Sequence, residues 1–371
     1  MFKKSKFKNL FISGTMRTGG SLVSNILSAH KDVIILHDIL HFFRFIYKRY
    51  KPIYKNEVQY QLCGELSLRL RLRDEIKIDK DKFYKEFKKN NVKDYNGVYY
   101  SLFNVLLKEI PQKKIIGEYA NGHWQDIENF LSFDKQNRAI QVIRDPRGVV
   151  SSWKKITFSK KYKYLNSIFN WIHSFDTSNK LLKKYSKKRY LLIKFEDIHR
   201  NPKKVSEKLC KFLEIKFDKN MTSPLRWKKI FRNRFFYLNE SAYDHKKKVY
   251  GFSIKRNDLW KNYLNSWEVN LINHLCGSRM KSLGYQEINQ NKELIKIGLK
   301  NINKDKILKK NYSYLKKRKI GSSISYFNDP TNPLNWESRI KPGTKFVNGP
   351  EYKEYVKELK NVKKIAKSLI K

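Results

Sequence analysis

The sequence predicts an α/β protein with a mostly parallel central sheet flanked by helices. Three short apolar runs carry this prediction, at residues 10–13, 139–143 and 190–195. Each run has the length of a buried strand, and a helical pattern of apolar residues or a turn signal follows it. Strands that alternate with helices build parallel sheets that are covered on both faces.

The remaining elements follow in chain order. Small residues at 14–21 predict a turn, and apolar residues at helical spacing after it predict a helix. The other expected elements are a strand, or the approach to one, at 33–36, an aromatic and basic helix or loop at 40–50 that lines a cleft or packs on the core, mainly helical residues at 66–115, a strand ending near 118, and helices starting at 148 and spanning 202–213.

Polar motifs begin where three of these predicted strands end. They are the turn at 14–21, the stretch that starts at Arg144, and the pair Glu196-Asp197. Ligands of parallel sheets bind beyond the carboxyl ends of the strands. The sequence therefore predicts one shared site.

The charge of the chain is unusual. Its 371 residues hold 81 Lys+Arg against 34 Asp+Glu, a formal net charge of +47, while 40% of the residues are hydrophobic. This composition excludes a disordered chain. The charge suits a polyanionic partner, but the lysines are spread along the whole chain, which equally fits solvated faces.

Cysteines and apolar runs limit the cellular setting. Cys63, Cys210 and Cys276 form no CxxC pair, so we expect neither a zinc site nor a disulfide framework, and no metal is implied. No apolar run approaches the roughly 20 residues of a membrane helix. The apolar stretch at 9–13 is too short for a signal peptide. We expect a cytoplasmic protein without a transmembrane segment.

Composition changes near residue 290. We predict a domain over 1–290 and a basic C-terminal extension over 291–371, which wraps the domain or binds a partner. Within the extension, lysine runs precede a stretch at 328–350 that is rich in Pro and Asn, and an amphipathic helix is expected over 352–370.

The first loop has the composition of an anion site. Glycines between a strand and a helix let successive backbone N–H groups approach a phosphate, and the helix N-terminus adds partial positive charge. Arg17 can make two parallel hydrogen bonds to phosphate or sulfate oxygens, and Ser21 can donate its hydroxyl. No lysine precedes Ser21, so the pattern of ATP- or GTP-using P-loop enzymes is missing.

The second motif runs from Arg144 through Asp145 and Pro146 to Ser152. An arginine at a strand end and a serine eight residues later can flank one anion from two sides, and proline fixes the turn between them.

Together these motifs resemble the PAPS-dependent sulfotransferases, which use 3′-phosphoadenosine 5′-phosphosulfate as donor. Residues 17–22 are similar to the family's RSGTT-L loop, and residues 144–152 to its RDPR-x-V-x-x-S motif. Phe-Glu-Asp at 195–197 with Asn-Pro after it, and Trp-Lys-Asn at 260–262 with Leu-Gly-Tyr after it, resemble two further family segments. The resemblance covers about residues 8 to 287 and implies a P-loop-like sulfotransferase fold.

The resemblance assigns donor contacts residue by residue. It implies that the 5′-phosphosulfate is held by Arg17, Thr18, Gly19, Gly20, Ser21 and Leu22. It implies that Arg144 and Ser152 hold the 3′-phosphate, with Arg256 or Lys255 as an additional cation.

Two positions depart from the family pattern. Gly20 replaces a threonine, which removes a hydroxyl contact. The lysine of the family's G-E-K-T-P segment is missing at Gly117-Glu118-Tyr119-Ala120, which puts a substrate role for this segment in doubt.

The acceptor hydroxyl needs a general base. In several family members an acidic residue after an A-H-P-D-V-like stretch has this role, and here Ala29-His30-Lys31-Asp32-Val33 is followed by His37 and Asp38. We predict that the base is one of these two, with Arg17 stabilising the transferred charge. An imidazole is a natural base near neutral pH, and Asp38 could orient it. His41 and Glu118 are the remaining candidates.

The predicted function is transfer of a sulfuryl group from PAPS to an acceptor hydroxyl, which we expect to belong to a carbohydrate that can be anionic. Two alternatives stay open: a non-enzymatic polyanion-binding protein, and another nucleotide-using P-loop enzyme such as a kinase. No specific nucleic-acid partner is expected.

Overall fold

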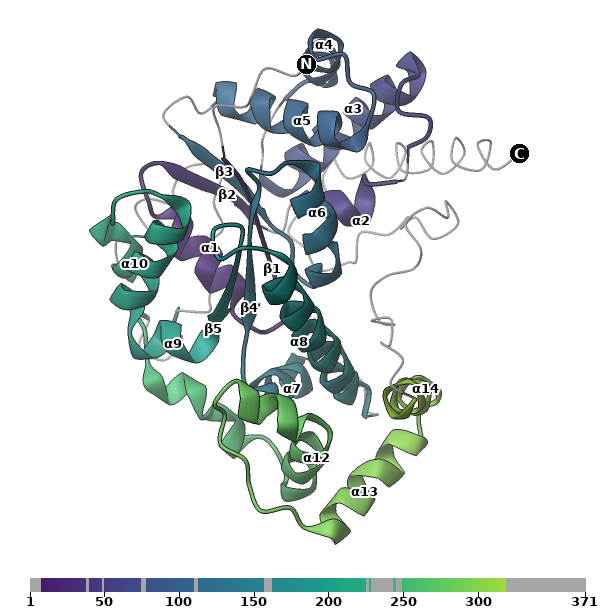
Figure 1. Ribbon diagram of the computed structural model, residues 1–371, viewed down its shortest axis with the longest axis vertical. Helices are drawn as coiled ribbons and strands as arrows, with labels where there is room; N and C mark the ends of the chain where they lie inside the picture. The colour runs from purple at the N-terminus through teal and green to yellow at the C-terminus, as the bar shows by residue number, and fades with distance from the viewer. Residues whose placement is uncertain are drawn as a thin grey trace.

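A five-stranded parallel sheet forms the centre of the protein, with the strand order β2-β3-β1-β4-β5 (Figure 1). The computed structural model describes residues 8–37, 40–48, 50–74, 78–109, 113–156, 162–224, 227, 243–244 and 249–317. The strands are β1 (Lys8–Ser13), β2 (Val33–His37), β3 (Ile115–Tyr119), β4 (Arg138–Ile143) and β5 (Tyr190–Lys194). The predicted α/β class with a mostly parallel sheet is confirmed.

The strand order places a switch point at the centre of the sheet. β1 pairs with β3 on one side and with β4 on the other, so that Phe11 lies between Glu118 and Ala139. The chain leaves β1 toward the edge strand β2, and it leaves β4 toward the opposite edge strand β5. Loops that leave adjacent strands in opposite directions open a crevice at the carboxyl edge. The loops after β1 and β4 meet there.

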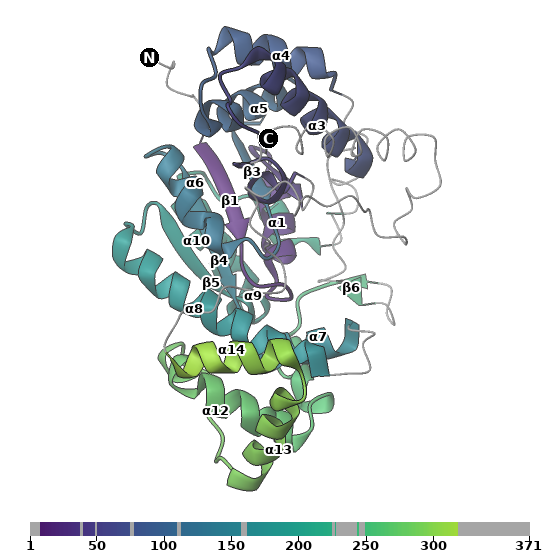
Figure 2. The same ribbon diagram turned by 90° about the vertical axis from the view of Figure 1, so that its right-hand side faces the viewer.

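Alternating side chains of the strands fill two separate cores, as the period of a β-strand requires. On one face Phe11, Leu36 and Ile116 pack under the helices of residues 42–133 and under α8. On the other face Leu10 and Ile12 pack under α1 and α10. Figure 1 shows α1 and α10 on one side of the sheet and α8 on the other. Figure 2, turned by 90°, shows the layer that contains α8 from the front.

The helices of the N-terminal half precede β4. They are α1 (Gly20–Ser28), α2 (Phe42–Phe45), α3 (Asn56–Asp74), α4 (Lys80–Lys89), α5 (Tyr95–Glu109), η1 (Trp124–Asp126) and α6 (Ile127–Phe133). Of the two expectations for residues 40–50, packing on the core is confirmed, because Phe42, Phe43 and Tyr50 are buried in it.

The remaining helices and short strands lie in the C-terminal half of the chain. Its elements are α7 (Pro146–Ile156), η2 (Tyr162–Leu165), α8 (Asn166–Lys184), α9 (Phe195–Arg200), α10 (Pro202–Leu213), η3 (Lys219–Thr222), β6 (Tyr243–Asp244), β7 (Val249–Tyr250), η5 (Ile254–Asn257), η6 (Leu259–Asn262), α12 (Ser266–Ser282), α13 (Lys292–Asn303) and α14 (Lys306–Lys316). The helix predicted over 202–213 has those bounds, whereas Phe195 begins α9 instead of ending β5.

The first part of the predicted C-terminal extension packs on the rest of the protein. Ile302 of α13 and Leu308 of α14 are buried in one core with Trp171 of α8 and Leu271 of α12. α13 approaches α12 so closely that a Cβ on Gly298 would lie 2.9 Å from the Leu271 Cβ. The boundary at residue 290 stays a prediction, and the helix expected over 352–370 lies outside the described residues.

In the part of the chain that the structure describes, no helix has both the length and the apolar character needed to cross a bilayer.

The packing of α13 predicts a large loss of stability for Ile302→Ala. Ile302 is fully buried, and truncation of such a side chain costs about 2–5 kcal/mol because it leaves a cavity. Ile297 on the same helix is 45% exposed, so Ile297→Ala should change the free energy of unfolding by less than about 0.5 kcal/mol. Urea titrations of both variants measure the difference. Equal midpoints would show that α13 is not part of the folded core.

Candidate active site

The loop between β1 and α1 is a tight turn that rests on β4. The hydroxyl of Thr18 donates to the carbonyl of Thr15 over 2.7 Å, and a Cβ on Gly14 would lie 2.4 Å from the carbonyl oxygen of Val142. Arg17 and Gly19 both have positive φ, 73° and 94°. No side chain caps α1, so its first N–H groups face the loop as an anion site would require.

The individual loop residues have different roles. The hydroxyl of Thr18 shapes the loop, and Leu22 is fully buried in the core beneath it. Arg17 is exposed and Ser21 is half-buried. Of the predicted loop contacts, Arg17 and Ser21 therefore offer side chains, and Gly19 and Gly20 offer backbone.

The two departures from the family pattern contact each other. A Cβ on Gly20 would lie 2.4 Å from Cε2 of Tyr119, so the tyrosine ring occupies the space that a side chain at position 20 would need. The Ser21 hydroxyl lies 3.4 Å from the Tyr119 hydroxyl. Glycine at one position and tyrosine at the other form a matched pair, which neither motif reveals alone.

Arg17 joins the two anion motifs. Its Nε donates to the Ser152 hydroxyl over 2.7 Å, across 135 residues of sequence. Its carbonyl oxygen accepts from Nη1 of Arg144 over 3.2 Å. The predicted meeting of these three residues at one edge of the sheet is thus found in the structure.

Arg144 is held in place from several sides. Its guanidinium stacks on the Phe195 ring at 4.2 Å, and its Nη2 donates to the carbonyl of Arg256 over 3.4 Å. Gly148 leaves room for it, because a Cβ there would lie 2.7 Å from Nε. That Nε is buried and has no hydrogen-bond partner among the described residues. A fixed, half-buried cation with an unused donor suits an anionic ligand.

Positive charge concentrates at this point. Burial lowers the pKa of Arg144, with Glu196 opposing this shift and Arg17 adding to it. Burial, followed by the charges of Arg256 and Arg144, lowers the pKa of His199 to about 3. His199 is therefore neutral, and the cations remain available to a ligand.

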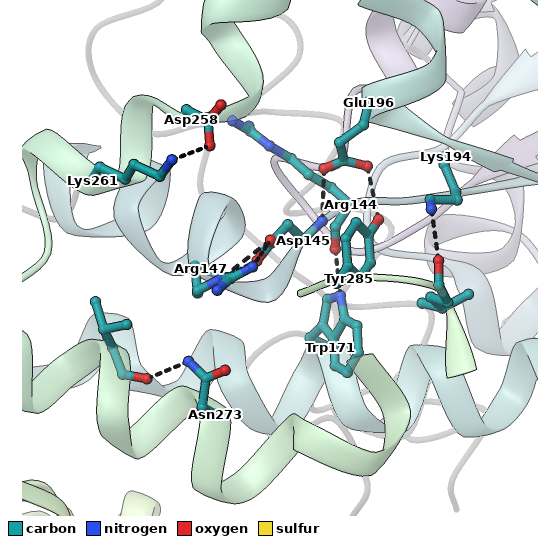
Figure 3. Close-up of polar contacts among 12 residues, drawn as sticks. Arg144, Asp145, Arg147, Trp171, Lys194, Glu196, Asp258, Lys261, Asn273 and Tyr285 are labelled. Carbon is teal, nitrogen blue, oxygen red and sulfur yellow. Dashed lines mark hydrogen bonds and ion pairs between the residues drawn. The ribbon is translucent and has the colours of Figure 1, made fainter. Parts of the chain in front are cut away.

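A buried carboxylate supports Arg144 from behind, as Figure 3 shows. Glu196 accepts from the backbone N–H of Asp145 over 2.9 Å and from the Tyr285 hydroxyl over 2.8 Å. The indole of Trp171 donates to the Arg144 carbonyl over 2.7 Å. These contacts fix the start of α7 to α8, to α9 and to the segment after α12.

Arg147 has a structural role in the second motif. It is buried, pairs with Asp145 through two nitrogens, and stacks on Trp260 at 4.3 Å. Three of the four segments that resembled family motifs therefore pack on one another through Glu196, Arg147 and their partners. The first loop joins them through Arg17.

One of the two predicted bases, His37, lies on the other side of the first loop. His37 ends β2; its Nδ1 lies 3.1 Å from the Ser24 hydroxyl, and its ring centroid lies 5.0 Å from that of Tyr119. Asp38 lies outside the described residues. Glu118 is fully buried and accepts from the Phe42 N–H over 3.0 Å, so it fixes the start of α2.

Sequence reasoning missed three residues at this edge. Tyr119 ends β3, and His123 and Asp126 follow that strand in the sequence. No local pattern marks His123 or Asp126, and Tyr119 stood out only as a departure from the family segment. His123 Nε2 lies 3.4 Å from His41 Nδ1, and His123 Nδ1 lies 3.1 Å from an Asp126 oxygen. Only the position of β3 beside β1 brings them to the site.

The family model described as "Sulfotransferase family" matches residues 9–219, the region that holds both anion motifs. This chain belongs to the sulfotransferase family. A solved sulfotransferase domain from the curacin biosynthetic pathway has the same fold, with a TM-score of 0.51 at 17% identity over 76% of this chain and 99% of that domain.

Curated relatives match this chain over a shorter region. Carbohydrate sulfotransferase 1 of Mus musculus and that of Danio rerio are each 24% identical, over 180 and 182 residues. The match covers 42% of this chain, 41% of the mouse protein and 40% of the zebrafish protein. The chain thus spans about two fifths of the length of these relatives.

The burial of Glu196 predicts a pH-dependent stability that Glu196→Gln removes. Burial raises the pKa of this carboxyl, although its hydrogen bonds oppose the shift. The folded state then binds the proton more tightly than the unfolded state, whose pKa is about 4.3. The stability that this carboxyl contributes is therefore complete below the unfolded-state pKa and is lost as the pH rises through the folded-state pKa.

Urea titrations between pH 4.5 and 7.5 measure this effect. The midpoint of the wild type should fall relative to that of Glu196→Gln as the pH rises. Glu293→Gln, at an exposed side chain of α13, is the control and should follow the wild type. Parallel curves for the wild type and Glu196→Gln would contradict the assignment.

Proposed function

We propose that this sulfotransferase transfers the sulfuryl group of PAPS to a hydroxyl of a carbohydrate acceptor. One observation carries the proposal: Arg17 of the first loop contacts both Ser152 and Arg144 of the second motif. PAPS has two anionic ends, a 5′-phosphosulfate and a 3′-phosphate, and the site has two adjoining anion-binding elements.

The residues present fit this donor. Arg17, Ser21 and the N–H groups at the start of α1 would hold the phosphosulfate end. Arg144, with its buried Nε left without a hydrogen-bond partner among the described residues, would hold the 3′-phosphate together with Ser152 and Arg256. When bound, PAPS supplies an activated sulfuryl group.

The chemistry asks two things of the protein. The negative charge on the leaving phosphate must be stabilised, and a fixed arginine and backbone N–H groups do so without reorganisation. Arg17 is restrained by Ser152 for this purpose. The acceptor hydroxyl must also lose its proton, for which the imidazoles of His37 and His41 lie at the carboxyl edge beyond β2.

A carbohydrate acceptor is supported by the match to two carbohydrate sulfotransferases, over part of their length. The net charge of +47 would favour an acidic glycan over a neutral one. Incubation with ³⁵S-labelled PAPS and a panel of neutral and acidic oligosaccharides tests this. We expect label on uronic-acid-containing members first.

Arg144→Ala should weaken the binding of adenosine 3′,5′-bisphosphate by about 10- to 100-fold, because hydrogen bonds to charged groups contribute about 1.5–3 kcal/mol each. Isothermal titration calorimetry at moderate salt measures the dissociation constant. Arg200→Ala, at an exposed arginine of the neighbouring α9, is the matched control and should bind like the wild type.

Two results would contradict the proposal. One is a wild type that does not bind the nucleotide. The other is binding that Arg144→Ala and Arg200→Ala weaken equally and that falls steeply with salt, as expected of a general polyanion-binding surface.

A further inference from the structure

Two imidazoles and a carboxylate form a chain of contacts at the acceptor side of the loop. Nδ1 of His41 lies 3.4 Å from Nε2 of His123, and Nδ1 of His123 lies 3.1 Å from Oδ2 of Asp126. The other Asp126 oxygen accepts from the Asn129 side chain over 3.2 Å, which fixes the carboxylate. His41 precedes α2, whereas the other residues follow β3. His123 is 82 residues from His41 in the sequence.

When both imidazoles are neutral, the chemistry of these contacts selects one tautomer for each ring. A carboxylate only accepts hydrogen bonds, so Nδ1 of His123 carries the hydrogen and its Nε2 has the lone pair. That lone pair accepts from Nδ1–H of His41, which leaves Nε2 of His41 as the basic nitrogen. A proton taken up there is stabilised through His123 by the charge of Asp126. The Ser24 hydroxyl beside His37 can donate or accept, so that contact selects no tautomer.

This chain of contacts runs from the protein interior to the edge of the site. His123 is 1% exposed, and its backbone N–H donates to the Ser13 hydroxyl over 3.0 Å. Ser13 directly precedes the first loop, and the N–H of Gly122 donates to the carbonyl of Gly14 over 3.0 Å. His41 is half-buried and is the outer end of the chain.

His41 is held in an unusual backbone conformation. Its φ of 45° and ψ of 51° lie in the left-handed region, which is unfavourable for a histidine. The Glu118 carboxylate that binds the Phe42 N–H keeps the next residue in place. Such strain persists where the surrounding structure imposes it, and it is concentrated at functional sites.

We propose that His41 is the general base of the transfer, and that His123 and Asp126 are positioning residues that set its tautomer. This rests on the proposed function. As the acceptor oxygen bonds to sulfur, the sulfur–oxygen bond to the 5′-phosphate breaks and its electron pair leaves with adenosine 3′,5′-bisphosphate. The acceptor O–H bond breaks, and its proton goes to Nε2 of His41.

Other titratable groups contact this pair or its neighbours in the sequence. Asp126 contacts His123, and Glu118 binds the N–H of Phe42. The Tyr99 ring lies 4.8 Å from the Phe42 ring, and burial, followed by the Glu118 charge, raises the pKa of this phenol. His173 accepts from the Trp124 indole, and burial lowers the pKa of this histidine.

The tautomers can be measured without an acceptor. Long-range ¹H–¹⁵N NMR of the full chain, labelled at its 8 histidines, distinguishes the two ring nitrogens. His41→Gln and His123→Gln assign the signals. We expect a hydrogen on Nδ1 in both residues of the neutral form, and Asp126→Asn should abolish this pattern for His123, because an amide can also donate. A hydrogen on Nε2 of His123 in the wild type would overturn the proposal.

Steady-state kinetics with the oligosaccharide that accepts the ³⁵S label test whether His41 is the general base. His41→Gln should lower kcat by about 100-fold or more with the affinity for adenosine 3′,5′-bisphosphate unchanged. Asp126→Asn should move the acid limb of the kcat profile to lower pH, because the His41 cation loses its stabilisation. His274→Gln, at an exposed histidine of α12, is the control and should match the wild type.

Failure of this proposal differs from failure of the proposed function. If His41→Gln binds the nucleotide and keeps kcat and the acid limb while His37→Gln loses them, His37 is the base and the donor site stands. If the wild type does not bind the nucleotide, the proposed function itself fails.

Discussion

The proposed nucleotide end of the site depends on a carboxyl group that folding buries. Glu196 takes one hydrogen bond from the chain after β4 and one from Tyr285, and it lies beside the Arg144 guanidinium. An unpaired carboxylate would be costly there, whereas one that is bonded on both oxygens can fix its partners. Three segments far apart in the sequence are thereby held in one arrangement, and Arg144 projects from it.

The parallel sheet turns this arrangement into a site. β1 and β4 are neighbours whose chains leave in opposite directions, so the loops after them share one crevice. Arg17 connects the loops through Ser152 and Arg144. On the far side of the first loop, β3 contributes Tyr119, which fits against Gly20, and the segment with His123. The proposed sites of anion binding and proton removal thus lie on opposite sides of a single turn.

Much of the donor side could be predicted from the sequence, because it depends on local signals. Apolar runs mark β1, β4 and β5, and an arginine directly after β4 and another in the loop after β1 indicate an anion site. The proposed acceptor side, with Tyr119 and His123, could not be predicted in this way, because it depends on the order of the strands in the sheet. No sequence signal near Tyr119 or His123 shows that β3 lies between β1 and β2. From the sequence alone, Gly20 indicates only that the hydroxyl contact of the family's threonine is missing. Likewise, Tyr285 is 89 residues from Glu196, and their pairing needs the tertiary structure.

A crystal structure of the full chain with adenosine 3′,5′-bisphosphate tests the proposed donor site most directly. We expect the 5′-phosphate on the N–H groups of residues 17–21 and the 3′-phosphate in contact with Arg144 and Ser152. A nucleotide bound elsewhere, or bound with its two phosphates exchanged, would contradict the assignment of the site.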